Sequence, residues 1–121
     1  MAYESNKTVS IKATASLATK QYTFVKLDSS GQITTPSAAA SAIGVLQDKP
    51  AAGDPGAVCL SGSITKILCG GNFNAGGAVC SDGNGAAVAA TSGGYVLGVA
   101  LSAGATGFIT TIIFQPQASK M

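Results

Sequence analysis

Hydrophobic and polar residues alternate in the N-terminal part of the chain. Over residues 8–17, Thr, Ser or Lys alternates with the apolar residues Val9, Ile11, Ala13, Ala15 and Leu17. Successive side chains of a strand point to opposite faces, so this period of two predicts a half-buried first β-strand. Residues 1–7 are mostly polar and are predicted to form an extended N-terminal arm.

Further runs rich in β-branched and aromatic residues follow, and turn residues bound each of them. They cover residues 22–27, 32–35, 42–47, 57–60, 63–68, 78–80, 86–90, 95–101 and 107–114. Short runs of this composition, closely spaced, are typical of antiparallel β-proteins. The sequence therefore predicts an all-β fold, a small β-tulip-like sandwich or barrel of about nine or ten short strands.

An internal repeat becomes visible when the chain is offset by 54 residues. The offset aligns six pairs: Val25 with Val79, Asp28 with Asp82, Gly31 with Gly85, Ile43 with Leu97, Gly44 with Gly98, and Val45 with Val99. Each copy reads as a strand, a turn that begins at Asp and ends at Gly, and an aliphatic-Gly-Val strand. Two similar β-units packed about a pseudo-two-fold axis are predicted. Chance identity in a chain rich in Gly and Val is the alternative.

Residue types that most enzymes use are scarce. The chain contains no His, and all seven of its basic residues are Lys. Histidine is the side chain that most readily exchanges protons near neutral pH. Most of the five acidic residues stand beside Gly, Pro or Ser, where turn chemistry already accounts for them. We therefore expect no catalytic site and no cofactor site, and the chain is not expected to be an enzyme.

Glycine-rich and cysteine-containing stretches raise the question of a ligand site. Residues 70–77 lack the Lys and Ser or Thr of a phosphate-binding loop, and residues 82–85 lack the spaced carboxylates of a calcium loop, so tight turns explain both. Cys59, Cys69 and Cys80 do not follow a zinc-binding spacing. We expect three buried thiols in a protein made in a reducing cytosol, and no metal site.

Charge and hydropathy bear on two classes of partner. The formal charge of +2 is small and the lysines are scattered, whereas duplex binding needs a clustered cationic face, so no nucleic acid partner is expected. Residues 86–114 are uncharged and apolar enough to suggest a transmembrane helix. Glycines divide this segment into runs of strand length, which favours strands and no membrane.

Several motifs together resemble one known family. They are Tyr-Thr-Phe-Val-Lys-Leu-Asp at 22–28, Ala-Ile-Gly-Val-Leu-Gln-Asp-Lys-Pro-Ala-Ala-Gly at 42–53, Ser-Gly-Ser-Ile-Thr-Lys at 61–66, Gly-Gly at 70–71, Ala-Gly-Gly-Ala-Val-Cys-Ser-Asp at 75–82 and Val-Leu-Gly-Val-Ala-Leu at 96–101. This pattern resembles the capsid decoration (cement) proteins of tailed bacteriophages over roughly residues 20–114. It departs from the family at Pro55-Gly56 and at Gly77.

The resemblance implies a mechanical function. A compact β-domain, often a homotrimer, would be made in the host cytoplasm and would dock on the outer capsid surface of the virion. There it would stabilise the shell by bridging major capsid proteins. Related cement proteins also bind as monomers or dimers.

The chain is divided by these patterns into three parts. Residues 1–19 are predicted to form an N-terminal arm and first strand, residues 20–116 a β-domain, and residues 117–121 a flexible C-terminal tail. Because an extended segment can add to the sheet edge of another protein, we expect the arm to bind the capsid or a neighbouring subunit through Tyr3, Lys7, Val9 and Ile11. The alternative is an ordinary first strand within its own domain.

Two other functions remain open at this point. A host-surface-binding fibre or adhesin subunit is one, although glycan sites generally use aromatic faces and the chain has no Trp and three Tyr. A small membrane-inserted phage protein is the other.

Overall fold

The computed structural model describes residues 8–90 and 93–116 of the chain. Every regular element in these residues is a strand, which confirms the predicted all-β fold. The strands are β1 (Thr8–Lys12), β2 (Phe24–Leu27), β3 (Ile33–Thr34), β4 (Gly44–Leu46), β5 (Pro55–Cys59), β6 (Ile64–Leu68), β7 (Ala78–Ser81), β8 (Ala87–Ala89), β9 (Gly98–Ala100) and β10 (Ile109–Phe114). Each of them overlaps one of the runs predicted from the sequence.

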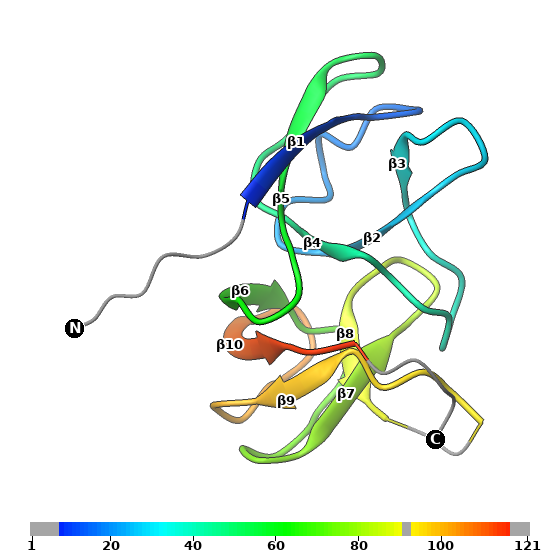
Figure 1. The fold of residues 1–121 in the computed structure, drawn as a ribbon. Coiled ribbons are helices and arrows are strands. Elements are labelled where there is room, and N and C mark those ends of the chain that lie inside the picture. The colour runs from blue at the N-terminus through cyan, green and yellow to red at the C-terminus, as the bar shows by residue number, and fades with distance from the viewer. Residues whose placement is uncertain (1–7, 91–92, 117–121) are drawn as a thin grey trace.

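The strands form two antiparallel sheets of five strands each. The first sheet has the order β1-β5-β4-β2-β3 and the second the order β6-β10-β9-β7-β8. Figure 1 shows the first sheet above the second, with β4 of the first facing β6 and β10 of the second. We call the first sheet with its loops the first unit, and the second sheet with its loops the second unit.

Both units are built on the same plan, as the repeat predicted. Phe24 lies opposite Val45 where β2 pairs with β4, and Ala78 lies opposite Val99 where β7 pairs with β9. Each residue of the second pair stands 54 positions after its equivalent in the first. Strands β3, β4 and β5 match β8, β9 and β10 at the same offset. We call residues related by this offset, or by an offset of 56 in the case of residues 8–17, counterparts.

A two-residue insertion separates the two copies near their edge strands. Strand β1 matches β6 at an offset of 56, because Thr8 lies opposite Cys59 and Ile64 lies opposite Ile113. The extra residues fall between Leu17 and Phe24, where Tyr22 has a φ of 65°. The carbonyl of Tyr22 accepts a hydrogen bond of 2.7 Å from the Leu68 amide at the end of β6. The insertion thus links the first unit to the edge of the second.

The first strand is shorter than the alternation of residues 8–17 predicted, since it ends at Lys12. Its partner β5 begins at Pro55, opposite Lys12, so regular pairing stops there. The Ala13 amide still donates to the Asp54 carbonyl, but the Thr14 amide donates to the carbonyl of Ile33. The chain has turned toward β3, and Ala13 and Leu17 are buried as loop residues rather than as strand residues.

Each unit has a core of its own. In the first unit it consists of Ala13, Leu17, Val25, Ile33, Leu46 and Val58. Their counterparts Cys69, Phe73, Val79, Ala87, Ala100 and Ile112 all belong to the second core. Such matching burial follows from the shared topology, because equivalent positions point into equivalent spaces.

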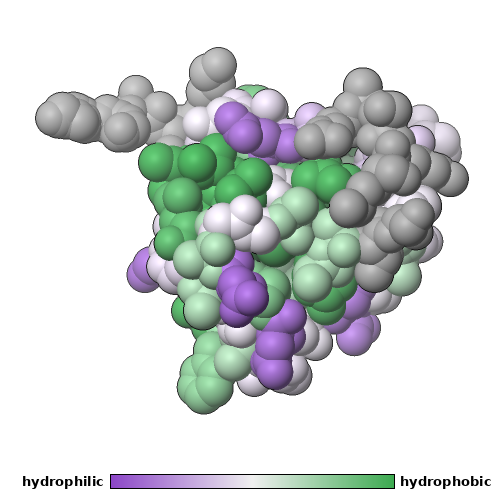
Figure 2. All heavy atoms as spheres, turned by 90° about the horizontal axis from the view of Figure 1, so that it is seen from below, coloured by the Kyte–Doolittle hydropathy of each residue, from purple (hydrophilic) through white to green (hydrophobic). Residues whose placement is uncertain are grey.

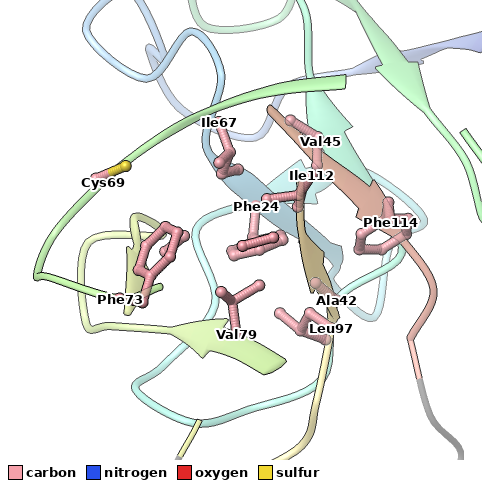
Figure 3. Packing of buried hydrophobic residues seen from close by; sticks show 12 residues of the cluster. Phe24, Ala42, Val45, Ile67, Cys69, Phe73, Val79, Leu97, Ile112 and Phe114 are labelled. Atoms are coloured by element: carbon pink, nitrogen blue, oxygen red, sulfur yellow. The ribbon is translucent and has the colours of Figure 1, made fainter. Parts of the chain in front are cut away.

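The second core also receives residues from the first unit. Phe24 and Val45 are fully buried among Ile67, Leu97 and Phe114 of the second unit, and the rings of Phe24 and Phe114 lie 6.0 Å apart between centroids. Figure 3 shows Phe24 at the centre of this packing, between Val79 and Ile112. We call this contact between the two units the junction.

Candidate binding surfaces

Metal-ligating side chains are not clustered in the part of the chain that the structure describes. Among residues 8–90 and 93–116 there is no group of three or more metal-ligating side chains and no pocket. Every buried side-chain nitrogen or oxygen in the same residues has a hydrogen-bond partner. Within them, no helix has the length and apolarity needed to cross a membrane.

The three cysteines are buried, as predicted. Cys69 lies in the second core, and burial raises the pKa of its thiol above the ordinary value, although the backbone amides of Ala105 and Thr110 oppose this shift. A protonated thiol is a poor nucleophile and a poor metal ligand. Cys69 therefore acts as a small core residue.

Asp28 and Asp82 organise equivalent turns in the two units. Asp28 Oδ1 accepts from the amides of Ser30 and Gln32, and Asp82 Oδ1 accepts from those of Asn84 and Ala86. The Thr14 hydroxyl also donates to Asp28, and this bond, followed by that from Gln32, lowers the pKa of the Asp28 carboxyl. Both carboxylates are committed to turn geometry rather than to a ligand.

The free edge of β1 is the first candidate binding surface. Within residues 8–90 and 93–116, strand β1 stands at the end of its sheet and pairs with β5 alone, through the register from Thr8 to Lys12. Pro55 has no amide hydrogen and lies opposite Lys12, so the pair is not hydrogen-bonded. Because amides alternate in direction along a strand, those of Ser10 and Lys12 point away from β5. Their backbone groups form an edge able to accept another strand.

The corresponding edge of β6 is less accessible. Its end is bonded to the Tyr22 carbonyl through the Leu68 amide. Lys12 is the counterpart of Leu68 in the first unit, and no such bond to its amide is present among the described residues. The segment that holds the two-residue insertion therefore bonds to the end of β6, and the described residues form no equivalent bond to the end of β1.

The predicted binding residues fall in two places. Tyr3 and Lys7 lie outside the described residues. Val9 and Ile11 lie on β1, where Val9 is 38% exposed and Ile11 is half-buried against the first core. Strand β1 is thus part of the first sheet, which matches the alternative expectation of a strand in its own domain, while its outer edge stays open.

A second candidate surface was not anticipated from the sequence. The outer face of the second sheet carries Ile64, Val99, Leu101, Ile109 and Ile113, which we call the outer patch. Ile64, Leu101 and Ile109 are 43%, 44% and 52% exposed, and Val99 and Ile113 are half-buried. Ile64, Ile113 and Val99 are contiguous, because Ile113 lies opposite both of the others, whereas Lys66 and Thr111 lie opposite each other and separate these residues from Ile109 on the same face. Figure 2 views the molecule from below and shows apolar areas, in green, with hydrophilic residues, in purple, between them.

The signal for the outer patch was present in strand 107–114. A half-buried strand alternates, but Ile109 and Ile113 place apolar side chains on the face opposite to Ile112 and Phe114. A strand that is apolar on both faces is expected to be covered on both. Phe108, which is 70% exposed and stands just before β10, is not one of the outer-patch residues.

Comparisons with known proteins agree with the resemblance seen in the sequence. The family model described as phage cement protein matches residues 3–112. Among solved structures, the chain is similar to the head fiber gp8.5 N base in bacteriophage phi29, with a TM-score of 0.74, 17% sequence identity, and coverage of 95% of this chain and 97% of that chain. At this identity the likeness supports the fold alone. A comparison with curated proteins found no match.

Proposed function

The chain belongs to the phage cement protein family, whose model spans residues 3–112, and on this premise we propose that it binds the outer surface of a phage capsid and stabilises the shell by bridging major capsid proteins. The family match is the observation that carries the proposal. It is a phage structural protein of the virion, and we expect it to be made in the host cytoplasm, to form a homotrimer and to have no enzymatic activity.

Strand addition at β1 is the proposed mode of attachment. An extended segment of the shell, or of a neighbouring subunit, pairs with the backbone groups of Ser10 and Lys12. Main-chain hydrogen bonds then supply affinity, while side chains such as Val9 and Ile11, together with Tyr3 and Lys7 of the preceding arm, supply specificity. This mode needs no catalytic residue and no cofactor.

Binding to undecorated heads tests the function directly. Purified heads are mixed with the protein, occupancy is measured by electron microscopy, and the heads are then heated. Decorated heads are expected to withstand a higher temperature than bare ones. Heads that bind no protein, or that bind it without any gain in resistance to heat, would refute the function.

The mode of attachment is tested by a proline in β1. Ser10→Pro removes an amide on the free edge, where proline is tolerated, and is expected to reduce occupancy at least tenfold. Gly83→Ala, in an exposed turn far along the chain from β1, is the matched control and is expected to bind normally. Equal occupancy by the wild type and a folded Ser10→Pro protein would exclude strand addition at this edge.

Salt dependence separates this mode from an electrostatic one. The chain carries a formal charge of +2, and the proposed contacts are backbone hydrogen bonds and apolar side chains. Raising the salt concentration from about 50 to 500 mM screens charges and is expected to change occupancy by less than about threefold. A steep loss of occupancy over this range would indicate that charged groups dominate attachment.

A role as the base of a fibre on the head is the second candidate. The specific observation is the fold likeness to a head fiber base, a chain of which 97% is covered. A chain that acts in this way would also bind the capsid but would carry a further protein that contacts the host. Adsorption of phage with and without the protein would reveal it, because a cement function alone predicts equal adsorption.

A further inference from the structure

The junction shows how one unit of this fold packs on another. Phe24 and Val45, which lie opposite each other on β2 and β4, insert among Ile67, Leu97 and Phe114 of the second unit. All five side chains are fully buried. The first unit therefore presents an inserting face, and the second unit presents a receiving face. This one-sided packing differs from the pseudo-two-fold arrangement that the repeat predicted, in which each unit would present both faces to the other.

The first unit inserts in the junction, but it also carries the counterpart of the receiving face. The second unit receives in the junction, but it also carries the counterpart of the inserting face. The first unit has Ile11, Ile43 and Leu60 at the positions of Ile67, Leu97 and Phe114. All three are apolar and only partly buried against the first core. We call them, together with Val9, the receiving patch.

The second unit carries the complementary surface. Ala78 and Val99 are the counterparts of Phe24 and Val45, and both are half-buried instead of fully buried. Val99 belongs to the outer patch. Ala78 adjoins the patch, because it lies opposite Val99. Within the described residues, nothing covers the outer patch as the second unit covers the inserting face of the first.

One contact of the junction identifies the expected meeting point. Gln47 Nε2 donates a hydrogen bond of 2.8 Å to the Thr65 hydroxyl across the junction. The counterpart of Gln47 is Leu101 and the counterpart of Thr65 is Val9. Both are exposed apolar side chains, at 44% and 38%. A polar pair inside the chain is thus matched by an apolar pair that would meet only between two chains.

We propose that the outer patch of one chain docks on the receiving patch of a second copy and repeats the junction between molecules. The contact is head-to-tail, because the two patches lie on different units of the same chain. Head-to-tail contacts either close into rings or extend into filaments. The inference extends the proposed homotrimer, in which three chains would arrange six units in a closed ring.

The test uses purified full-length protein without heads, so that self-association is measured separately from capsid binding. Val9→Glu and Leu101→Lys each place a charge in the contact, and each is expected to raise the concentration for half-assembly at least tenfold in sedimentation equilibrium. The double variant Val9→Glu/Leu101→Lys is expected to return it to within about threefold of the wild type. Opposite charges then meet where Leu101 of one chain reaches Val9 of the next.

Phe108→Lys is the matched control. Phe108 is the most exposed of the large hydrophobic residues, and its counterpart Asp54 is exposed and outside the junction. Assembly of this variant is expected to equal that of the wild type. Circular dichroism and thermal midpoints confirm that each variant is folded, as expected for substitutions at exposed positions.

Three results would overturn the inference. They are a wild type that stays monomeric at all concentrations, single variants that assemble normally, and a double variant no better than the single ones. A monomer whose Val9→Glu and Leu101→Lys variants lose head binding would assign both patches to the shell and also overturn self-docking. A trimer that assembles as described but fails to bind heads would refute the capsid function and leave this inference intact.

Discussion

Two counterpart glycines offer a sharp test of the duplicated architecture. Gly44 begins β4 and Gly98 begins β9. A Cβ atom on Gly44 would lie 2.2 Å from the Cys59 carbonyl oxygen, and one on Gly98 would lie 2.3 Å from that of Ile113. Both acceptors belong to the backbone of the neighbouring strand. We predict that Gly44→Ala and Gly98→Ala each destabilise the protein, and by similar amounts.

The size of the effect follows from what must move. Non-bonded atoms settle roughly 3.5 Å apart, so the neighbouring strand must shift by about 1 Å or its pairing must open. Overpacking of this kind costs about 1–3 kcal/mol, and a lost backbone hydrogen bond adds about 1 kcal/mol. The free energy of unfolding is therefore expected to fall by about 2–4 kcal/mol for each variant. For a domain of this size that corresponds to a drop in Tm of roughly 10 °C.

Gly83→Ala is the control, because a Cβ atom there meets nothing within 4 Å and the residue does not have a positive φ. Alanine at such a site restricts the unfolded chain and is expected to be neutral or to stabilise by up to about 1 kcal/mol. Urea unfolding followed by circular dichroism measures all three variants. Gly44→Ala and Gly98→Ala proteins within about 0.5 kcal/mol of the wild type would refute the close strand approach in both units.

Two further predictions concern ionisable groups. Because the pKa of Asp28 is lowered in the folded state, its contribution to stability is present above the unfolded pKa and is lost as pH falls through the folded value. Thr14→Val removes the main cause, so the loss of thermal stability between about pH 5 and pH 2 should be smaller than in the wild type; an identical pH profile would contradict this. Because the pKa of the buried Cys69 thiol is raised, the stability that it contributes is present below the unfolded pKa and is lost as pH rises through the folded value. Its alkylation by iodoacetamide at pH 8, followed by mass spectrometry, should be at least about 100-fold slower in the folded chain than in urea, and comparable rates would contradict the burial.

Local pattern predicted the strands well because each is a short apolar run bounded by turn residues. The repeat was also visible, since Asp28 and Asp82 begin turns whose hydrogen bonds are the same in both units. Local pattern could not predict the end of β1. Ala13 and Leu17 continue the alternation of the strand, but they are buried because loop residues and β3 bind this segment.

The binding surfaces were harder to predict than the fold. An apolar residue on a strand can face its own core or a partner, and periodicity does not distinguish the two. Val45 and Val99 illustrate this, because they occupy counterpart positions, yet Val45 is fully buried and Val99 is half-buried. Only the arrangement of the two units shows that the second unit covers Val45 of the first. Among the described residues, no unit covers Val99 of the second in the same way.

The junction inside the chain has a polar pair at its margin, whereas the proposed contact between chains has an apolar pair at the counterpart positions. This difference has a physical reason. Inside the chain, the connection from β5 to β6 holds the two units together at a high effective concentration, so the junction needs little extra affinity at its margin. A hydrogen bond from Gln47 to Thr65 suffices there and fixes the register. Between chains no connection helps, and burial of apolar area must supply the free energy at roughly 25 cal/mol per Å². Leu101 and Val9 at the counterpart positions are the side chains that such a contact requires.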